Sequence, residues 1–113
     1  MDFLVSDIYN FNSFIESKKA DCAKSIVMYL NGTIRIEEAM EFVNILLLYN
    51  YSEYSKSGVL KEFELFTNHI VINHSKSTSI CIISFLIKVL SANGIITECE
   101  SSIMNKRFIE NIQ

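Results

Sequence analysis

The amino-acid sequence predicts an all-α protein: a compact bundle of five or six helices that forms a single domain over residues 1–113. Apolar residues recur every three or four positions along most of the chain, which is the spacing of an amphipathic helix. The chain contains no proline, so long helices can run without interruption. Half of its residues are apolar and 20% are charged, a composition that can form a core without disulfides or metals.

The N-terminal part of the chain is predicted to be helical up to an Asn-Gly pair. Asp2 is a suitable N-cap for a first helix. The apolar stripe of this helix, with its continuation in the same phase, consists of Leu4, Ile8, Phe11, Ile15, Cys22, Ile26, Tyr29 and Leu30. A break in the helix, where there is one, falls at residues 17–19. Asn31-Gly32 ends the region, because both residues tolerate the left-handed backbone that follows a helix.

A further helix is predicted from Ile34 to about Tyr49, with Thr33 as its N-cap. Glu37 and Glu38 lie near its positive end, where the helix dipole favours carboxylates. Its first half is amphipathic, and the side chains expected to point outward are Arg35, Glu37, Glu38, Glu41 and Asn44. Its second half is apolar on every face, which is typical of a central, buried helix.

The next part of the chain begins with a polar segment, residues 50–58, that carries two tyrosines between two strongly apolar stretches. Beyond this loop, the spacing of Val59, Phe63 and Phe66 predicts a short helix. An alternative stays open for residues 62–73. The β-branched run at residues 70–72 also fits a short β-hairpin that turns at residues 67–69.

Two more helices complete the predicted bundle. Ser77 or Thr78 starts a helix that stops at Ala92-Asn93-Gly94. Thr97 and Glu100 have the spacing of a capping box, in which each side chain bonds the backbone N–H of the other residue. The last helix carries an apolar stripe formed by Ile103, Phe108 and Ile112. The residues predicted to include core positions are Leu47, Ile83, Phe85, Ile87 and Leu90.

No residue pattern predicts catalysis, a metal site or a cofactor. His69 and His74, the only histidines, are five positions apart and cannot present two ligands to one metal on a helix or on a strand. We expect them at the surface or in a turn. Cys81 lies in an apolar helical segment, where a thiol behaves as a small hydrophobic group, and the acids beside Cys99 oppose a reactive thiolate. The chain is therefore expected not to be an enzyme.

Carboxylates and tyrosines gather in the middle of the sequence. Tyrosine is enriched at protein interfaces, because it offers a large apolar body, a hydroxyl and few rotamers to immobilise. An acidic patch beside such residues would attract a basic protein. The candidate partner-binding residues are Glu37, Glu38, Glu41, Tyr51, Glu53, Tyr54, Glu62 and Glu64. The alternative interpretation is an ordinary solvated helix face with a loop, since charged surfaces are common.

Charge and hydropathy restrict the partners and the compartment. The net charge of −3 argues against nucleic acid, whose phosphates require a basic face. The longest uncharged apolar stretch, residues 77–87, is shorter than the roughly 20 residues that cross a bilayer, so no membrane contact is expected. The three widely spaced cysteines and the absence of a basic leader region indicate a reduced, cytoplasmic protein.

In size, acidity and composition the chain is similar to immunity and antitoxin proteins. This resemblance implies a stoichiometric inhibitor that binds a basic, nuclease-type toxin domain as a heterodimer. The chain also resembles virus-encoded, Bcl-2-like helical modulators, which hold a helix of a host protein in an apolar groove. A homo-oligomeric structural subunit, such as a homodimer, is the remaining alternative, and its marker would be an exposed apolar face over residues 79–90.

Overall fold

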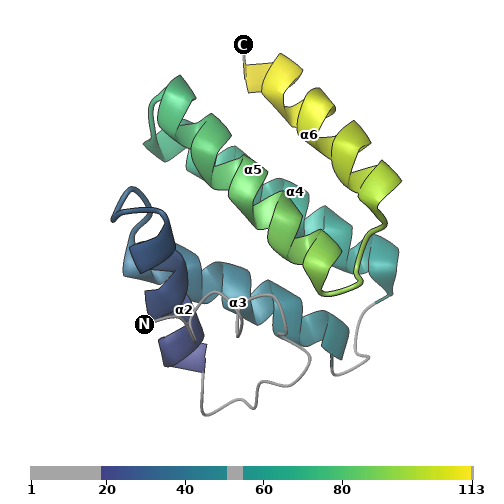
Figure 1. The fold of residues 1–113 in the computed structure, drawn as a ribbon, viewed down its shortest axis with the longest axis horizontal. Helices are drawn as coiled ribbons and strands as arrows, with labels where there is room; N and C mark the ends of the chain where they lie inside the picture. Colours follow the sequence, from purple (N-terminus) through teal and green to yellow (C-terminus); the bar gives the residue numbers. More distant parts are fainter. Residues whose placement is uncertain (1–18, 51–54, 113) are drawn as a thin grey trace.

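The computed structural model describes residues 19–50 and 55–112, which form five α-helices and no strand (Figure 1). The helices are α2 (Lys19–Tyr29), α3 (Ile36–Asn50), α4 (Lys56–Asn73), α5 (Lys76–Ala92) and α6 (Glu98–Ile112). The prediction of an all-α bundle is confirmed. The predicted helix with Asp2 as its cap lies outside the described residues. None of the described helices is long and apolar enough to cross a lipid bilayer.

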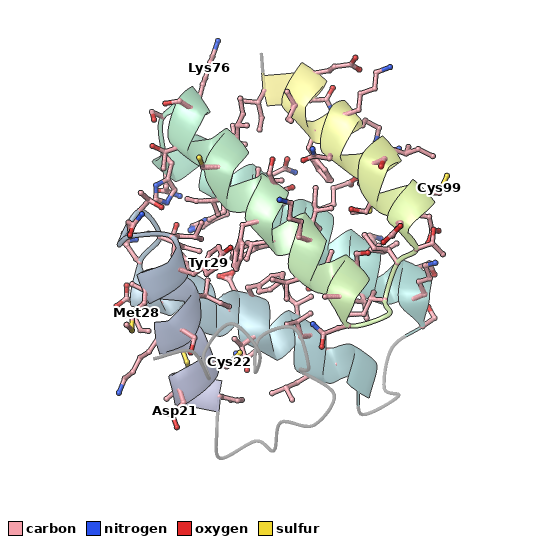
Figure 2. The ribbon with its side chains drawn as sticks, in the orientation of Figure 1. Asp21, Cys22, Met28, Tyr29, Lys76 and Cys99 are labelled. Atoms are coloured by element: carbon pink, nitrogen blue, oxygen red, sulfur yellow. The ribbon has the colours of Figure 1, made fainter. Side chains whose placement is uncertain are left out.

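Each helix packs against its neighbours in the chain: α2 against α3, α3 against α4, α4 against α5 and α5 against α6. Helices α5 and α6 run side by side, α4 lies behind α5 in the view of Figure 1, and α2 packs against α3. Helix α3 also contacts α4. Tyr29 points from α2 toward the interior and stacks on Phe85 of α5 with ring centroids 4.4 Å apart, whereas its neighbour Met28 points outward (Figure 2). This stacking contact joins α2 to α5.

Four phenylalanines from three helices form the middle of the core. Phe63 of α4 lies with its ring centroid 5.9 Å from that of Phe42 on α3 and 6.1 Å from that of Phe108 on α6, both edge to face. Phe66 lies one turn along α4, 6.0 Å from Phe42. Edge-to-face contacts between buried aromatic rings add to the stabilisation that comes from burying their area. The aromatic cluster therefore holds α3, α4 and α6 together.

The predicted core positions are confirmed. All of these residues lie on α3 or α5 and are buried: Leu47, Ile83, Phe85, Ile87 and Leu90. Apart from the exposed Cys81, the apolar residues of α5 between residues 79 and 90 are buried or half-buried, because α4 and α6 cover them. The exposed apolar face that would mark a homo-oligomeric subunit is therefore absent from this described helix.

Residues 62–73 belong to one continuous helix, so the alternative of a β-hairpin is wrong. Helix α4 runs unbroken from residue 56 to residue 73. The apolar side chains that it buries are spaced three or four positions apart: Val59, Phe63, Phe66 and Ile70. Burial of this helical stripe outweighs the β propensity of the run at residues 70–72, where Val71 and Ile72 remain exposed.

Three helix boundaries follow the local signals. The Thr97 hydroxyl accepts a bond from the Glu100 N–H at 3.1 Å and the Glu100 carboxylate accepts one from the Thr97 N–H at 2.8 Å, which confirms the capping box. After α2, Asn31 and Gly32 have φ angles of 55° and 76°, and the Gly32 N–H donates to a carbonyl of α2 at 2.9 Å. Gly94, with φ 76°, ends α5 in the same way.

Three helix starts differ from the prediction. Helix α4 begins at Lys56, inside the segment 50–58 that was predicted to be a loop. Thr33 is not the N-cap of α3, because its hydroxyl donates to the Leu30 carbonyl of the preceding turn at 2.7 Å. The helix begins at Ile36 instead. Helix α5 begins one residue before the earliest predicted start, since the Ser75 hydroxyl accepts a bond from the Thr78 N–H at 3.3 Å.

Two residues that were assigned to apolar surroundings face solvent. Ile103 of α6 is 59% exposed, while Phe108 and Ile112 on the same helix are buried. Ile103 lies five residues before Phe108 and nine residues before Ile112. These separations correspond to about 140° and 180° around a helix, so Ile103 cannot share their face. Cys81 is also exposed, because it lies on the outer side of α5 next to two buried isoleucines.

Candidate protein-binding groove

An open groove of about 450 Å³ lies between α3 and α4. Helix α3 contributes one wall and helix α4 the other. The lining residues are Glu41, Asn44, Ile45 and Leu48 from α3, with Glu62, Leu65, Phe66 and His69 from α4. The residues of each wall are spaced by three or four positions, so each helix presents one continuous face to the groove.

The floor of the groove is apolar and one of its edges is an exposed leucine. Ile45 and Phe66 are buried, and Leu48 is half-buried. Leu65 stands at the edge with 56% of its surface exposed, although a leucine that meets no partner gains nothing from facing water. Ile72, two turns further along α4 on the same side, is 80% exposed. Together these residues offer apolar area that the bundle itself does not cover.

The groove also carries negative charge on both sides. Glu41 on α3 is exposed and Glu62 on α4 is half-buried. Within the described part of the chain, no lysine or arginine lines the groove and neither carboxylate forms an ion pair. A basic group placed in the groove would therefore meet two carboxylates that form no ion pair with the described residues.

The structure divides the predicted acidic site. Glu41 and Glu62 come together at the groove, and Glu37 is exposed in the first turn of α3. Glu64 lies on another side of α4, in smaller hollows that it shares with Arg107 of α6. The other members of the predicted set, Tyr51, Glu53 and Tyr54, lie outside the described residues.

Glu38 was predicted to point outward, and this prediction is wrong. Its side chain is only 2% exposed. Both carboxylate oxygens lie 3.0 Å from His74 Nε2, and one of them accepts a bond from the Arg35 N–H at 3.0 Å. The Arg35 guanidinium lies 3.6 Å away. Glu38 therefore connects the start of α3 to the turn between α4 and α5, and it is unavailable to a partner.

Two opposing effects determine the pKa of Glu38. Burial raises the pKa of this carboxyl group, while the hydrogen bonds from Arg35 and His74 and the attraction of their charges lower it. The lowering effects prevail, so the pKa of Glu38 lies below its ordinary value. The carboxyl group is therefore held in its charged form inside the bundle.

Two features of this region were not predicted from the sequence. The first is His74, which was expected merely at a surface or turn, although it is the hydrogen-bonding partner of Glu38. The second is the exposed apolar edge of α4. Its signal was present in the sequence, because Glu62, Leu65, His69 and Ile72 follow one another at steps of three and four residues.

A second hollow, of about 610 Å³, lies where α5 ends and α6 begins. Lys88 and Glu98 give it one charge of each sign, and three serines supply much of its remaining lining. Its surface is less apolar than that of the α3–α4 groove, and it has no excess of charge. The groove between α3 and α4 is therefore the better candidate for a protein partner.

The described residues contain no group of three or more histidine, cysteine, aspartate or glutamate side chains that could hold a metal ion. Cys99 is exposed in the first turn of α6 (Figure 2).

No family model matches the chain, and comparisons with curated proteins and with solved structures gave no significant match.

Proposed function

We propose that this chain is a cytoplasmic, stoichiometric protein-binding inhibitor of the immunity or antitoxin kind, and that its partner is a basic protein such as a nuclease-type toxin domain. The single observation that carries this proposal is the α3–α4 groove, where Glu41 and Glu62 lie on two different helices beside an apolar floor. The two kinds of surface have different tasks in an interface.

The carboxylates would act mainly on the rate of association. Complementary charges steer two proteins toward a productive encounter and disfavour partners of the wrong sign. The exposed apolar area would act mainly on the rate of dissociation, because desolvated apolar anchors at the centre of an interface carry most of its binding energy. Tyr51 and Tyr54, which lie between α3 and α4 in the sequence, remain the proposed aromatic anchors.

The proposal is tested by capture followed by reconstitution. The full chain is used as bait in extracts of its source, the bound protein is identified by mass spectrometry, and the purified pair is titrated by calorimetry. We expect a partner of high isoelectric point, a stoichiometry of one to one, and loss of the activity of the partner at equimolar inhibitor. An acidic partner, or a bound partner whose activity is unaffected, would contradict the proposal.

The loop tyrosines give a separate prediction. Removing the side chain of an anchor by Tyr51→Ala or Tyr54→Ala should weaken binding by about 2 kcal/mol, mainly through faster dissociation. Surface plasmon resonance with the captured partner measures this rate. Tyr29→Phe is a suitable control, because Tyr29 is half exposed on α2 and keeps its ring stacked on Phe85 after the change. Unchanged dissociation in both alanine variants would place the anchors elsewhere.

A further inference from the structure

The α3–α4 groove has the features of a site for a helix, and we infer that it holds a basic amphipathic helix of the partner, laid along α4. This inference rests on the proposed function, since it specifies the part of the basic partner that enters the groove. Three properties of the described residues support it: the shape of the groove, the spacing of its exposed apolar edge, and the sign of its charge.

The shape fits because two packed helices leave a furrow between them that a third helix can fill. Helices pack through side-chain ridges that enter such furrows, at axis separations of about 8–10 Å. The floor formed by Ile45, Leu48 and Phe66 would receive the large side chains of the incoming helix. Grooves with apolar floors bind amphipathic helices through residues repeated at three, four and seven positions.

The spacing of the exposed edge matches the same repeat. Leu65 and Ile72 are seven residues apart on α4, which corresponds to nearly two full turns and about 10 Å of rise. They therefore point in almost the same direction, with His69 between them. A helix laid beside α4 can contact both residues with apolar side chains that are also seven positions apart.

The charge selects a basic helix over the two occupants that the chain itself could provide. Residues 1–18 contain three acidic residues, Asp2, Asp7 and Glu16, against the single lysine Lys18, so this segment is acidic overall and would bring like charge to Glu41 and Glu62. A second copy of the chain has a net charge of −3 and meets the same objection. Like charges facing each other across an interface cost several kcal/mol, whereas lysines or arginines flanking the apolar stripe would be attracted.

The probe for this inference is a synthetic helical peptide of about 15 residues, the shortest length at which an isolated helix is stable enough to study. Leucines occupy positions repeated at three, four and seven residues, and lysines occupy the rest. The peptide is titrated into the full chain labelled with ¹⁵N, and binding is followed by NMR. A second peptide carries a central proline that prevents the helix, and a third carries glutamate in place of lysine.

We expect the lysine peptide to bind at one to one and to shift the resonances of the groove residues, while the proline and glutamate peptides bind at least about tenfold more weakly. Leu65→Ser should weaken the lysine peptide by about tenfold. Ile103→Ser is the matched control, because Ile103 is 59% exposed, as Leu65 is 56% exposed, but lies on α6. This control should bind the peptide as the wild type does.

Three results would overturn the inference. Equal binding of the proline peptide would show that no helix is needed, and shifts confined to α6 would place the site elsewhere. Failure of the lysine peptide to bind, while the captured basic partner still requires Glu41 and Glu62, would reject a helix in the groove and leave the proposed function intact. If the captured partner is not basic, the proposed function fails as well.

Discussion

Replacing Phe63 with alanine is expected to lower the free energy of unfolding by about 4 kcal/mol, within the range for a buried aromatic residue. Phe63 is 0% exposed and its ring contacts Phe42 and Phe108 on two other helices. The substitution removes these contacts and leaves a cavity where α3, α4 and α6 meet. Since domains of this size are stable by about 5–15 kcal/mol in total, the loss takes much of the stability.

The measurement is urea denaturation followed by circular dichroism, with two further variants on the same helix. Phe63→Leu keeps most of the volume and should cost clearly less than the alanine variant. Leu65→Ala, two residues away, truncates a side chain that is 56% exposed and should change the stability by less than roughly 0.5 kcal/mol. Equal midpoints for Phe63→Ala and Leu65→Ala would show that the aromatic cluster is not the core.

The second large effect concerns the buried contact between Glu38 and His74. His74→Ala should lower the free energy of unfolding by about 3 kcal/mol, because it leaves a buried carboxylate without one of its hydrogen-bond donors. The His74 ring is 13% exposed and the Glu38 side chain 2% exposed, so water cannot easily replace the lost contact. The double variant Glu38→Gln/His74→Ala should be less destabilised than the sum of the single variants predicts, because the amide leaves no uncompensated charge.

The same pair predicts how stability depends on pH. The pKa of Glu38 in the folded protein lies below its ordinary value of 4.5. Its contribution to stability is therefore fully present above that ordinary value and is lost as the pH falls through the lowered pKa. The stability difference between the wild type and Glu38→Gln should shrink as the pH is reduced below 4.5. Glu41→Gln, which replaces an exposed carboxylate of the same helix, is the matched control.

Stability measured by denaturation at several pH values distinguishes these outcomes. Additive effects in the double variant would indicate that Glu38 and His74 do not interact, and a constant difference at all pH values would show that Glu38 titrates as an ordinary surface carboxylate. Because Glu38 is buried and hydrogen-bonded within the bundle, charge reversal at this position would destabilise the fold and cannot report on binding alone.

The helices could be predicted from sequence because their signals are local. The capping box of Thr97 and Glu100 involves residues three positions apart, and the glycine at the end of α5 acts through its own backbone. The role of Glu38 could not be predicted in this way. Its partner His74 is 36 residues away, and their contact exists only because α3 and α4 pack together.

The predicted acidic set was grouped by proximity along the sequence, and the structure places Glu62 and Glu64 on different sides of α4. On a strand, Glu62 and Glu64 would point to the same face, since side chains alternate with a period of two. On a helix, residues two positions apart point about 200° away from each other. Because residues 62–73 are helical, Glu62 faces the groove with Glu41, and Glu64 faces α6. Secondary structure alone thus decided which acids share a surface.

Calorimetry on the captured partner with two charge-reversal pairs tests the central claim most directly. Glu41→Lys/Glu62→Lys reverses the charge of the groove, and Glu98→Lys/Glu110→Lys makes the same change in net charge on exposed positions of α6. We expect the groove pair to weaken binding by about a hundredfold and the α6 pair to weaken it only by a small factor that salt removes. Equal weakening by both pairs, or no weakening by the groove pair, would contradict the claim that the α3–α4 groove holds a basic partner.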